Sequence, residues 1–327
     1  MIWIDTDGGV DDALAIAAAA KLVAGSDLVF STVFGNVSAR QAAYNVQRLL
    51  QLLDVTAPVF IGAERSSDGF VHYATEVHGA DGLGNSVGAV GADMQFAPLA
   101  GELRKIAERL KRESDPIRIL GIGPATNIPA IAEAIGSKRI GGITMMSGAI
   151  FDRGNITEHA EFNLYNDPDA LAQTLALGVP VTIVPLDICR KIIFNRADLA
   201  GFSAFGPAQD LLTRAHQFYM SSYRETEGID GCFPHDIITL LSMIYPSRFE
   251  FWNIPFDLDT SDQRRGKMRF HVNGKYHARF CLGGDLAWVR RLLGAWSFPA
   301  VEPFRSKTAV APGPPMGSRV GPTISAR

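Results

Sequence analysis

Four aspartates lie within eight positions near the start of the chain, in the stretch DTDGGVDD: Asp5, Asp7, Asp11 and Asp12. Two unit charges about 4 Å apart repel by roughly 4 kcal/mol at an effective dielectric constant near 20. A helix N-terminus stabilises each nearby carboxylate by only about 0.3–1 kcal/mol, which is too little to offset this repulsion. Either Asp11 or Asp12 caps a helix while the others are solvated or protonated, or carboxylate oxygens hold a hard divalent cation, Ca²⁺ or Mg²⁺.

Two other uses of this cluster need residues that the sequence does not clearly offer. An EF-hand loop requires a glycine at its sixth position and a glutamate at its twelfth, which do not fit here. A phosphatase-type nucleophile at Asp5 or Asp7 needs a downstream lysine and a serine or threonine aligned with the site. No convincing pair follows, so a Mg²⁺-dependent phosphohydrolase is kept as an alternative.

Further polar turns follow two later apolar runs. Gly35-Asn36 comes after the run Leu28–Phe34, and the sequence GPATN comes after Ile117–Ile122. Pro124 lacks an amide hydrogen, and a glycine turn leaves carbonyl oxygens free to face a crevice. Such carbonyls suit a hard cation. The segment does not make a dinucleotide site, because the third glycine of the GxGxxG pattern is missing.

An amide-rich loop at Ser147–Ala170 follows the predicted strand Lys138–Met146. Glu161 and Asn163 are two residues apart, so in an extended backbone their side chains would face one side together. A carboxylate beside an amide suits hydrogen bonding to sugar hydroxyls. Asp167, which precedes a proline, is instead predicted to cap the next helix.

Two histidines stand at positions that suit a site. His78 lies in the glycine-rich segment Ser66–Gly91, and it is either an exposed loop histidine or a functional residue. His235 and Asp236 open an apolar helix, where Asp236 either caps that helix or joins the site. Cys232 could serve as a nucleophile, but a lone cysteine without a paired base supports this weakly.

The elements that must position these residues alternate between strands and helices. Met1–Ile4 is a predicted strand that leads through Gly8-Gly9 into a helix from Asp12. Ser38 is predicted to cap a second helix. This order predicts one α/β domain with an open, mostly parallel sheet flanked by helices, Rossmann-like, whose ligands bind at the carboxyl ends of the strands. The other predicted elements are strands at Val59–Ile61 and Val179–Pro185, helices at Pro98–Arg112, within Ala197–Arg224 and at Leu286–Leu293, and a strand-rich segment at Glu250–Leu282.

The composition narrows the class of protein. Of 327 residues, 47% are hydrophobic and 20% are charged. The 31 basic and 34 acidic residues give no excess of basic charge, so the composition does not indicate nucleic-acid binding. The alanine-rich stretch is too short to span a membrane, and the acidic N-terminus does not resemble a secretory signal. Three widely spaced cysteines indicate a reducing cytoplasm. Residues 1–296 are predicted to form the domain, and the Pro-, Gly-, Ser- and Arg-rich residues 297–327 a flexible tail.

Taken together, these motifs resemble the inosine-uridine preferring nucleoside hydrolases, a family marked by an N-terminal D-x-D-x-G-x-D-D pattern, and the match runs from Ile2 to about Leu293. The resemblance implies Ca²⁺-dependent hydrolysis of the N-glycosidic bond of ribonucleosides, giving ribose and a free base. It also implies a homodimer or homotetramer. A non-catalytic nucleoside-binding protein on the same fold is the other alternative.

The resemblance further implies a role for each matching residue. Metal ligands would come from Asp7, Asp12, the Ile122 carbonyl and Asp236, and Asp7 would also be the general base for a metal-bound water. Asp11 and Asp236 would hold the 2′ and 3′ hydroxyls, helped by Asn36 and Asn163, whereas Asn155 and Glu161 would reach the 5′ hydroxyl. His235 and His78 would lie near the leaving base, and His235 could change charge near neutral pH.

Three further expectations concern single positions. Asp5 is predicted to be a structural hydrogen-bond acceptor that holds the turn. Gly8 stands where the family usually has proline, which is expected to loosen the turn without removing a ligand. The segment from Tyr223 to Phe233 is expected to line the pocket for the base, although its residue types do not rank purine against pyrimidine.

Overall fold

The sheet runs through the whole domain. In the computed structural model, which describes residues 1–110 and 115–301, ten strands form one sheet in the order β4-β3-β2-β1-β5-β6-β7-β10-β8-β9. The strands from β4 to β10 in this order are parallel, and β8 and β9 add an antiparallel end. Their bounds are β1 (Ile2–Thr6), β2 (Leu28–Thr32), β3 (Val59–Ile61), β4 (Ala97–Pro98), β5 (Ile117–Gly121), β6 (Ile140–Met146), β7 (Val181–Val184), β8 (Phe249–Asp259), β9 (Lys267–Phe270) and β10 (Tyr276–Gly284).

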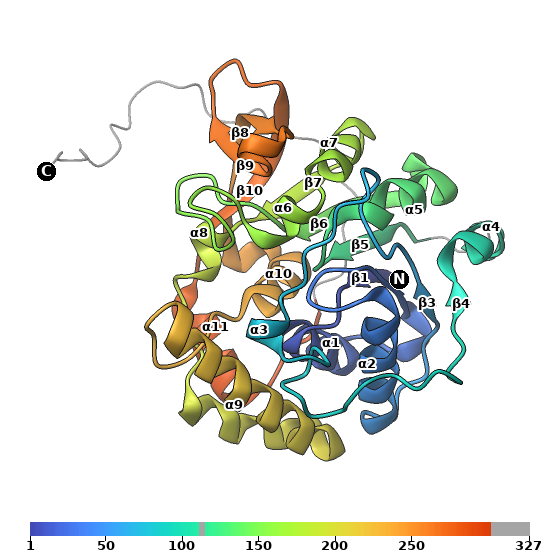
Figure 1. Cartoon of the computed structure of the whole chain (residues 1–327), viewed down its shortest axis with the longest axis vertical. Coiled ribbons are helices and arrows are strands. Elements are labelled where there is room, and N and C mark those ends of the chain that lie inside the picture. The colour runs from blue at the N-terminus through green and yellow to red at the C-terminus, as the bar shows by residue number, and fades with distance from the viewer. Residues whose placement is uncertain (111–114, 302–327) are drawn as a thin grey trace, which may run out of the picture.

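Helices cover both faces of the sheet (Figure 1). One face packs against α1 (Val10–Leu22), α2 (Ala39–Leu52), α8 (Leu186–Cys189), α9 (Gln209–Thr226), α10 (His235–Ile244) and α11 (Leu286–Ala295). The other packs against α4 (Leu99–Leu110), α5 (Ile128–Ile135) and α7 (Pro168–Ala176). The short helices α3 (Thr75–His78) and α6 (Phe162–Asn166) interrupt the long loops. This arrangement confirms the predicted mostly parallel, helix-flanked sheet.

Helix α1 occupies the centre of the first face. Its residues from Val10 to Ala19 are all buried, because α2, α9 and α10 pack around it. The small alanine side chains let these neighbours approach closely, and a helix enclosed on all sides has no need for a polar face. The helix start, which carries Asp11 and Asp12, is therefore fixed by packing at the carboxyl end of β1.

Several local predictions are confirmed. The Ser38 hydroxyl accepts a hydrogen bond from the Gln41 amide at 3.2 Å and so caps α2. Asp167 caps α7 by accepting from the Ala170 amide at 3.0 Å, with Pro168 at the first helical position. The predicted strand-rich segment forms β8, β9 and β10.

Other predictions need correction or lie outside the described residues. Glu161 and Asn163 do not share an extended segment: Glu161 is extended but is the N-cap of α6, and Asn163 lies in the first turn of that helix. The side-chain carboxylate satisfies two free amides at the helix start, which favours the helical turn over a strand. The predicted helix Pro98–Arg112 is described only as far as Leu110, and the predicted tail is not described from residue 302 onward. In the described part of the chain, no helix is both long and apolar enough to cross a bilayer.

Candidate active site

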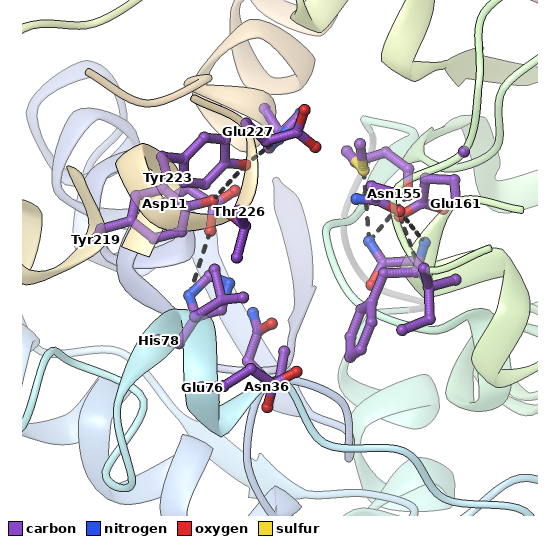
Figure 2. Close-up of a pocket in the computed structure, with 18 of the residues that line it drawn as sticks. Asp11, Asn36, Glu76, His78, Asn155, Glu161, Tyr219, Tyr223, Thr226 and Glu227 are labelled. Atoms are coloured by element: carbon purple, nitrogen blue, oxygen red, sulfur yellow. Dashed lines mark hydrogen bonds and ion pairs between the residues drawn. The ribbon is translucent and has the colours of Figure 1, made fainter. Parts of the chain in front are cut away.

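A cavity of about 590 Å³ opens at the carboxyl ends of the parallel strands. Strand ends, α3, α9, α10 and the loop after β6 contribute to its walls, as open α/β folds are expected to arrange. Figure 2 shows Tyr219, Tyr223 and His78 on one side and Asn155 and Glu161 on the other. Every predicted site residue except Asp7 and Asp12 lines this cavity: Asp11, Asn36, His78, Ile122, Asn155, Glu161, Asn163, His235 and Asp236.

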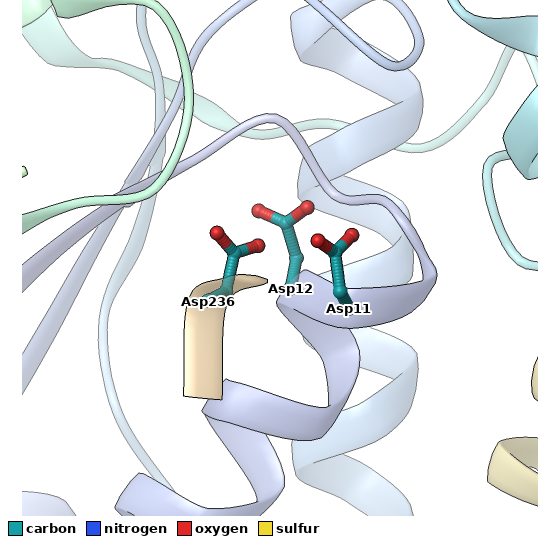
Figure 3. A group of neighbouring side chains, drawn as sticks. All are labelled: Asp11, Asp12 and Asp236. Atoms are coloured by element: carbon teal, nitrogen blue, oxygen red, sulfur yellow. The ribbon is translucent and has the colours of Figure 1, made fainter. Parts of the chain in front are cut away.

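The floor of the cavity contains a group of buried carboxylates. One oxygen each from Asp11, Asp12 and Asp236 lie within 4.8 Å of one another. Asp11 and Asp12 come from the first turn of α1, and Asp236 from the first turn of α10. Figure 3 shows the three carboxylates pointing the same way from the ends of these two helices. Oxygen ligands of this kind suit a hard divalent cation.

Asp7 joins this group through Asn36. The Asn36 amide nitrogen donates to Asp7 Oδ2 at 2.8 Å, and its side-chain Nδ2 donates to Asp7 Oδ1 at 2.9 Å and Asp12 Oδ2 at 3.1 Å. Gly35 makes this approach possible, because a Cβ there would lie 2.0 Å from Asp7 Oδ2. Both carboxylates are fully buried. Asn36 therefore fixes the spacing between Asp7 and Asp12.

Helix capping explains only part of the cluster. The N-cap of α1 is Gly9, not Asp11 or Asp12. Asp12 lies three residues further and accepts from the Gly9 amide at 2.9 Å, while its other oxygen accepts from the Thr6 hydroxyl. Asp12 is thus bonded to the turn, whereas capping leaves Asp7 and Asp236 unexplained.

Burial and mutual repulsion dominate the electrostatics of the floor. Burial, followed by the charge of Asp12, raises the pKa of both Asp7 and Asp11 well above the usual range. Burial and the charge of Asp11 do the same to the pKa of Asp236. Among the described residues, no lysine or arginine forms an ion pair with these carboxylates, and His78 Nδ1 lies 3.9 Å from Asp11. The floor holds more negative charge than its protein partners balance.

Asp5 is separate from this group, as predicted. The Ser31 hydroxyl and Asn127 Nδ2, the latter at 2.9 Å, donate to its Oδ1. Trp3 Nε1 in turn donates to Ser31 at 2.8 Å, so the carboxylate ties β1 to β2 and to the turn after β5. Burial raises the pKa of Asp5 to about 7. Its role as a structural acceptor is confirmed.

Gly8 is held firmly rather than loosely. Its φ of +71° is left-handed, which favours glycine, and a Cβ would lie 2.6 Å from the Ala42 Cα. Asn45 Nδ2 donates to the Gly8 carbonyl at 2.9 Å, and the Gly8 amide donates to the Thr6 hydroxyl at 3.2 Å. The expectation of a loosened turn is wrong, because these bonds and contacts fix it.

One wall of the cavity carries polar groups from the loop after β6. Glu161 is buried and accepts from the amides of Gly148, Asn163 and Leu164 at 2.7–3.0 Å. Burial raises the pKa of Glu161, and these amides act against the increase. Asn155 Oδ1 accepts from the Phe162 amide at 2.9 Å. The wall therefore presents a fixed carboxylate and a carboxamide toward the cavity.

The opposite wall carries aromatic rings and two histidines. The Tyr223 hydroxyl lies 2.8 Å from His235 Nε2 and 3.2 Å from the Tyr219 hydroxyl. The Tyr219 ring packs on His78 with 4.8 Å between ring centroids. His78 is buried, not an exposed loop residue, and its Nδ1 accepts from the Val10 amide at 3.1 Å. That bond leaves Nε2 of His78 as the protonated nitrogen of the neutral ring.

His235 does not change charge near neutral pH in this structure. Burial, followed by the charge of Arg190, lowers its pKa to about 3, and burial likewise lowers the pKa of His78 to about 3. Both rings are therefore neutral at pH 7, which corrects the sequence-based expectation for His235. Its Nδ1 is buried without a hydrogen-bond partner among the described residues.

Sequence reasoning missed part of the lining. Tyr219 and Tyr223 are four residues apart in α9, so both reach the cavity from one helix face, and this spacing was a readable signal. Tyr223 and Glu227 confirm in part that the segment from Tyr223 to Phe233 lines the cavity. Arg153 has no comparable signal, because a lone arginine in a loop is common.

Known proteins share this fold and this sequence pattern. A solved plant nucleoside hydrolase, PpNRh1, superposes with a TM-score of 0.79 at 27% identity, over 90% of this chain and 97% of that one. A purine-preferring ribonucleoside hydrolase from Gardnerella vaginalis has a TM-score of 0.77 at 24% identity, over 90% of this chain and 96% of that one, and shows the fold alone. Pyrimidine-specific ribonucleoside hydrolase RihA of Salmonella agona (strain SL483) is 31% identical over 254 residues, 76% of this chain and 80% of its own length.

The sheet and the acidic cavity define an α/β protein with a ligand site at the carboxyl ends of its strands. A model of the inosine-uridine preferring nucleoside hydrolases matches residues 2–290. The chain belongs to this family. It is a ribonucleoside hydrolase, as the sequence motifs predicted.

Proposed function

We propose that this enzyme hydrolyses the N-glycosidic bond of ribonucleosides with the help of Ca²⁺, releasing ribose and a free base. One observation carries the proposal: among the described residues, a cluster of buried aspartates that pair with no lysine or arginine forms the floor of a cavity, between the wall formed by the loop after β6 and the aromatic wall. The cavity volume of about 590 Å³ suits a small molecule such as a nucleoside.

The donor set fits a hard cation. Asp11, Asp12 and Asp236 offer carboxylate oxygens that lie within 4.8 Å of one another. In this proposal the cation would be held by Asp7, Asp12, Asp236 and the Ile122 carbonyl, with Asp11 beside it. Burial, followed by mutual repulsion, raises the pKa of Asp7 and Asp236, and divalent charge would offset the repulsion. When bound, the cation lowers the pKa of a water and orients the sugar hydroxyls. Ca²⁺ accepts six to eight oxygen ligands in flexible geometry, which suits carboxylates from three separate elements.

Asp7 is the general base in this proposal. Asn36 binds both of its oxygens and so fixes its orientation. Burial, followed by the charge of Asp12, raises its pKa, which makes its carboxylate a stronger base toward an attacking water. The proton would move from that water to a carboxylate oxygen of Asp7.

The ribose would lie between the floor and the wall after β6. Asp11 and Asp236, with Asn36 and Asn163, would accept from or donate to the 2′ and 3′ hydroxyls. Asn155 and Glu161 would bind the 5′ hydroxyl. Cleavage passes through an oxocarbenium-like state, and the surrounding carboxylates stabilise positive charge that develops only there.

The base would lie against Tyr219, Tyr223 and the two histidines. Because His235 is neutral at pH 7, it would act as a hydrogen-bond partner and not as an imidazolium acid. The Tyr223 hydroxyl and His235 Nε2 share one hydrogen bond. If one of these two residues donated a proton to the leaving base, the other could replace that proton through this bond. His78 would support the base through its Nε2–H.

The phosphohydrolase alternative is less well supported. Within the described residues, the cavity lining contains one basic residue, Arg153, and six acidic ones: Asp11, Glu76, Glu158, Glu161, Glu227 and Asp236. A transferred phosphoryl group carries negative charge and needs several cationic groups around it. The excess of carboxylates would repel such a substrate.

A nucleoside panel tests the proposal. Purified enzyme would be incubated with common purine and pyrimidine ribonucleosides, with Ca²⁺ or with a chelator, and reducing sugar would be measured. Ribose release that depends on Ca²⁺ supports the proposal. Tight nucleoside binding without any product would instead indicate a binding protein, and phosphate release from a phosphorylated substrate would indicate the phosphohydrolase.

The surroundings in the cell are also proposed from the chain itself. Cys189, Cys232 and Cys281 are free and buried, which suits a reducing cytoplasm. We further propose that the enzyme assembles as a homodimer or homotetramer, as the family resemblance implies. Sedimentation equilibrium of the purified chain would measure the assembly.

A further inference from the structure

The loop after β6, which carries Asn155 and Glu161, is hydrogen-bonded to a short segment after β7. Asp187, in α8, accepts from the amides of Ile150 and Phe151 at 3.0 and 2.8 Å. Arg190, directly after α8, donates to the carbonyls of Arg153 and Gly154 at 2.5 and 3.0 Å. Two charged side chains, three residues apart, thus bind four peptide groups of one loop, two at Ile150 and Phe151 and two at Arg153 and Gly154, directly before Asn155.

Arg190 also connects this loop to the opposite wall. Its guanidinium lies 3.4 Å from Asp152 in the loop and 3.6 Å from Glu227, which follows α9. Figure 2 shows Glu227 on the side of Tyr223, across the cavity from Asn155. The Arg190 side chain is only 11% exposed, so solvent screens these contacts weakly. Arg190 is therefore bonded to both walls at once.

We propose that Arg190 is a positioning residue that sets the distance between the Asn155 loop and helix α9, and thereby the recognition of the 5′ hydroxyl. The inference rests on the proposed function, in which Asn155 and Glu161 bind that hydroxyl. Arg190 does not itself line the cavity. It acts through the carbonyls of the residues before Asn155 and through Glu227.

The electrostatics of the neighbours agree with this placement. Burial raises the pKa of Glu161 and the charge of Arg190 acts against that increase, so the guanidinium also acts on a residue of the wall that it positions. A lysine could keep the charge, but it lacks the planar fork that reaches two carbonyls and a carboxylate together. The proposed role of residue 190 therefore depends on the planar shape of the guanidinium and not on its charge alone.

The test compares a ribonucleoside with its 5′-deoxy analogue. A substrate that loses a hydrogen bond to a charged group is expected to react at least about tenfold more slowly in kcat/KM with wild-type enzyme. In Arg190→Met this ratio should fall to less than about threefold, because the loop no longer places Asn155 and Glu161. Arg190→Lys should recover the ratio only in part.

Arg265 provides a matched control. It is 5% exposed, donates to the carbonyls of Tyr165 and Asn166 at 2.6 and 2.9 Å, and pairs with Asp68 at 2.7 Å, but it does not line the cavity. Arg265→Met should lower the Tm comparably while leaving the 5′-deoxy ratio near that of wild type. Glu227→Gln weakens the contacts that Arg190 and Arg153 make to the residue after α9 but keeps the bonds of Arg190 to the loop carbonyls, so it should lower the ratio less than Arg190→Met does.

The outcomes separate the two proposals. If wild-type enzyme cleaves no ribonucleoside, or cleaves the 5′-deoxy analogue equally well, the proposed function or its 5′ subsite is wrong. If wild-type enzyme discriminates and a folded Arg190→Met or Arg190→Lys keeps the full ratio, the role of Arg190 is wrong. An equal loss of the ratio in Arg265→Met would likewise overturn it, because general destabilisation would then explain the result.

Discussion

The floor of the cavity and the ion pairs around Glu227 both concentrate charge, but they balance it in opposite ways. Arg153 and Arg190 pair with Glu227, and Arg190 also lies beside Asp152. On the floor, Asp7, Asp12 and Asp236 have no such cation among the described residues, and burial raises the pKa of each. The ion pairs of Arg190 fix the position of a loop. The unpaired, buried carboxylates of the floor instead favour the binding of a cation.

The largest effect should come from the floor. Asp7→Asn keeps the size of the side chain but removes the base, so kcat should fall by about 10²–10⁴-fold. Steady-state ribose release would measure it. Asp5→Asn is the matched control, since Asp5 is as fully buried as Asp7 and only two residues before it, but is bonded to Ser31 and Asn127. If the two variants lose kcat equally, the division of labour between Asp5 and Asp7 is wrong.

Removal of the cation should affect stability as well as activity, increasingly at higher pH. Without a cation, Asp7 and Asp236 have folded-state pKa values above the 3.8 of an unperturbed aspartate. Their protonated forms stabilise the fold at low pH, and this contribution is lost as pH rises through the raised pKa values. A bound cation replaces those protons. The Tm difference between Ca²⁺ and chelator should therefore widen from pH 5 to pH 8, and a constant difference would contradict the cation site.

A smaller effect is expected at the aromatic wall. Tyr223→Phe removes the hydroxyl that bonds His235, so kcat for a natural nucleoside should fall by about 3–10-fold, the value of one hydrogen bond. A 4-nitrophenyl riboside, whose leaving group departs without a proton, should be affected less. An equal loss with both substrates would place the Tyr223 hydroxyl outside leaving-group assistance.

The smallest effect is expected at the exposed ion pair between Arg153 and Glu227. The Arg153 side chain is 67% exposed, and its ion pair with Glu227 at 2.6 Å should contribute less than about 1 kcal/mol. Arg153→Ala should therefore change KM by less than about fivefold and Tm only slightly, and added salt should reduce even that difference. A large change would mean that the exposed pair, and not buried Arg190, holds the two walls together.

The sequence predicted the floor better than the walls. Asp7, Asn36 and Ile122 follow strands whose apolar runs are easy to recognise, and strand ends of a parallel sheet converge on one edge. Asp236 begins a helix far along the chain, where its local pattern left helix capping open, and the family resemblance assigned it to the site. Local patterns and this resemblance together therefore predicted the floor.

The walls depended on contacts that local patterns do not contain. Glu161 and Asn163 looked like neighbours in a strand, but free amides at the start of α6 made Glu161 a cap. The charge of His235 depends on burial and on Arg190, which is 45 positions away in the sequence. Arg190 itself has no sequence signal, because its partners lie in one loop and after one distant helix.

The turn at Gly8 bears on protein engineering by family consensus. Consensus replacements commonly stabilise proteins, and the resemblance would suggest proline at this position. Proline fixes φ near −65°, whereas Gly8 has φ of +71° and packs its backbone against Ala42. The replacement would have to re-form the turn that carries Asp7, so this position should be left out of any consensus design unless Ala42 and Asn45 are redesigned with it.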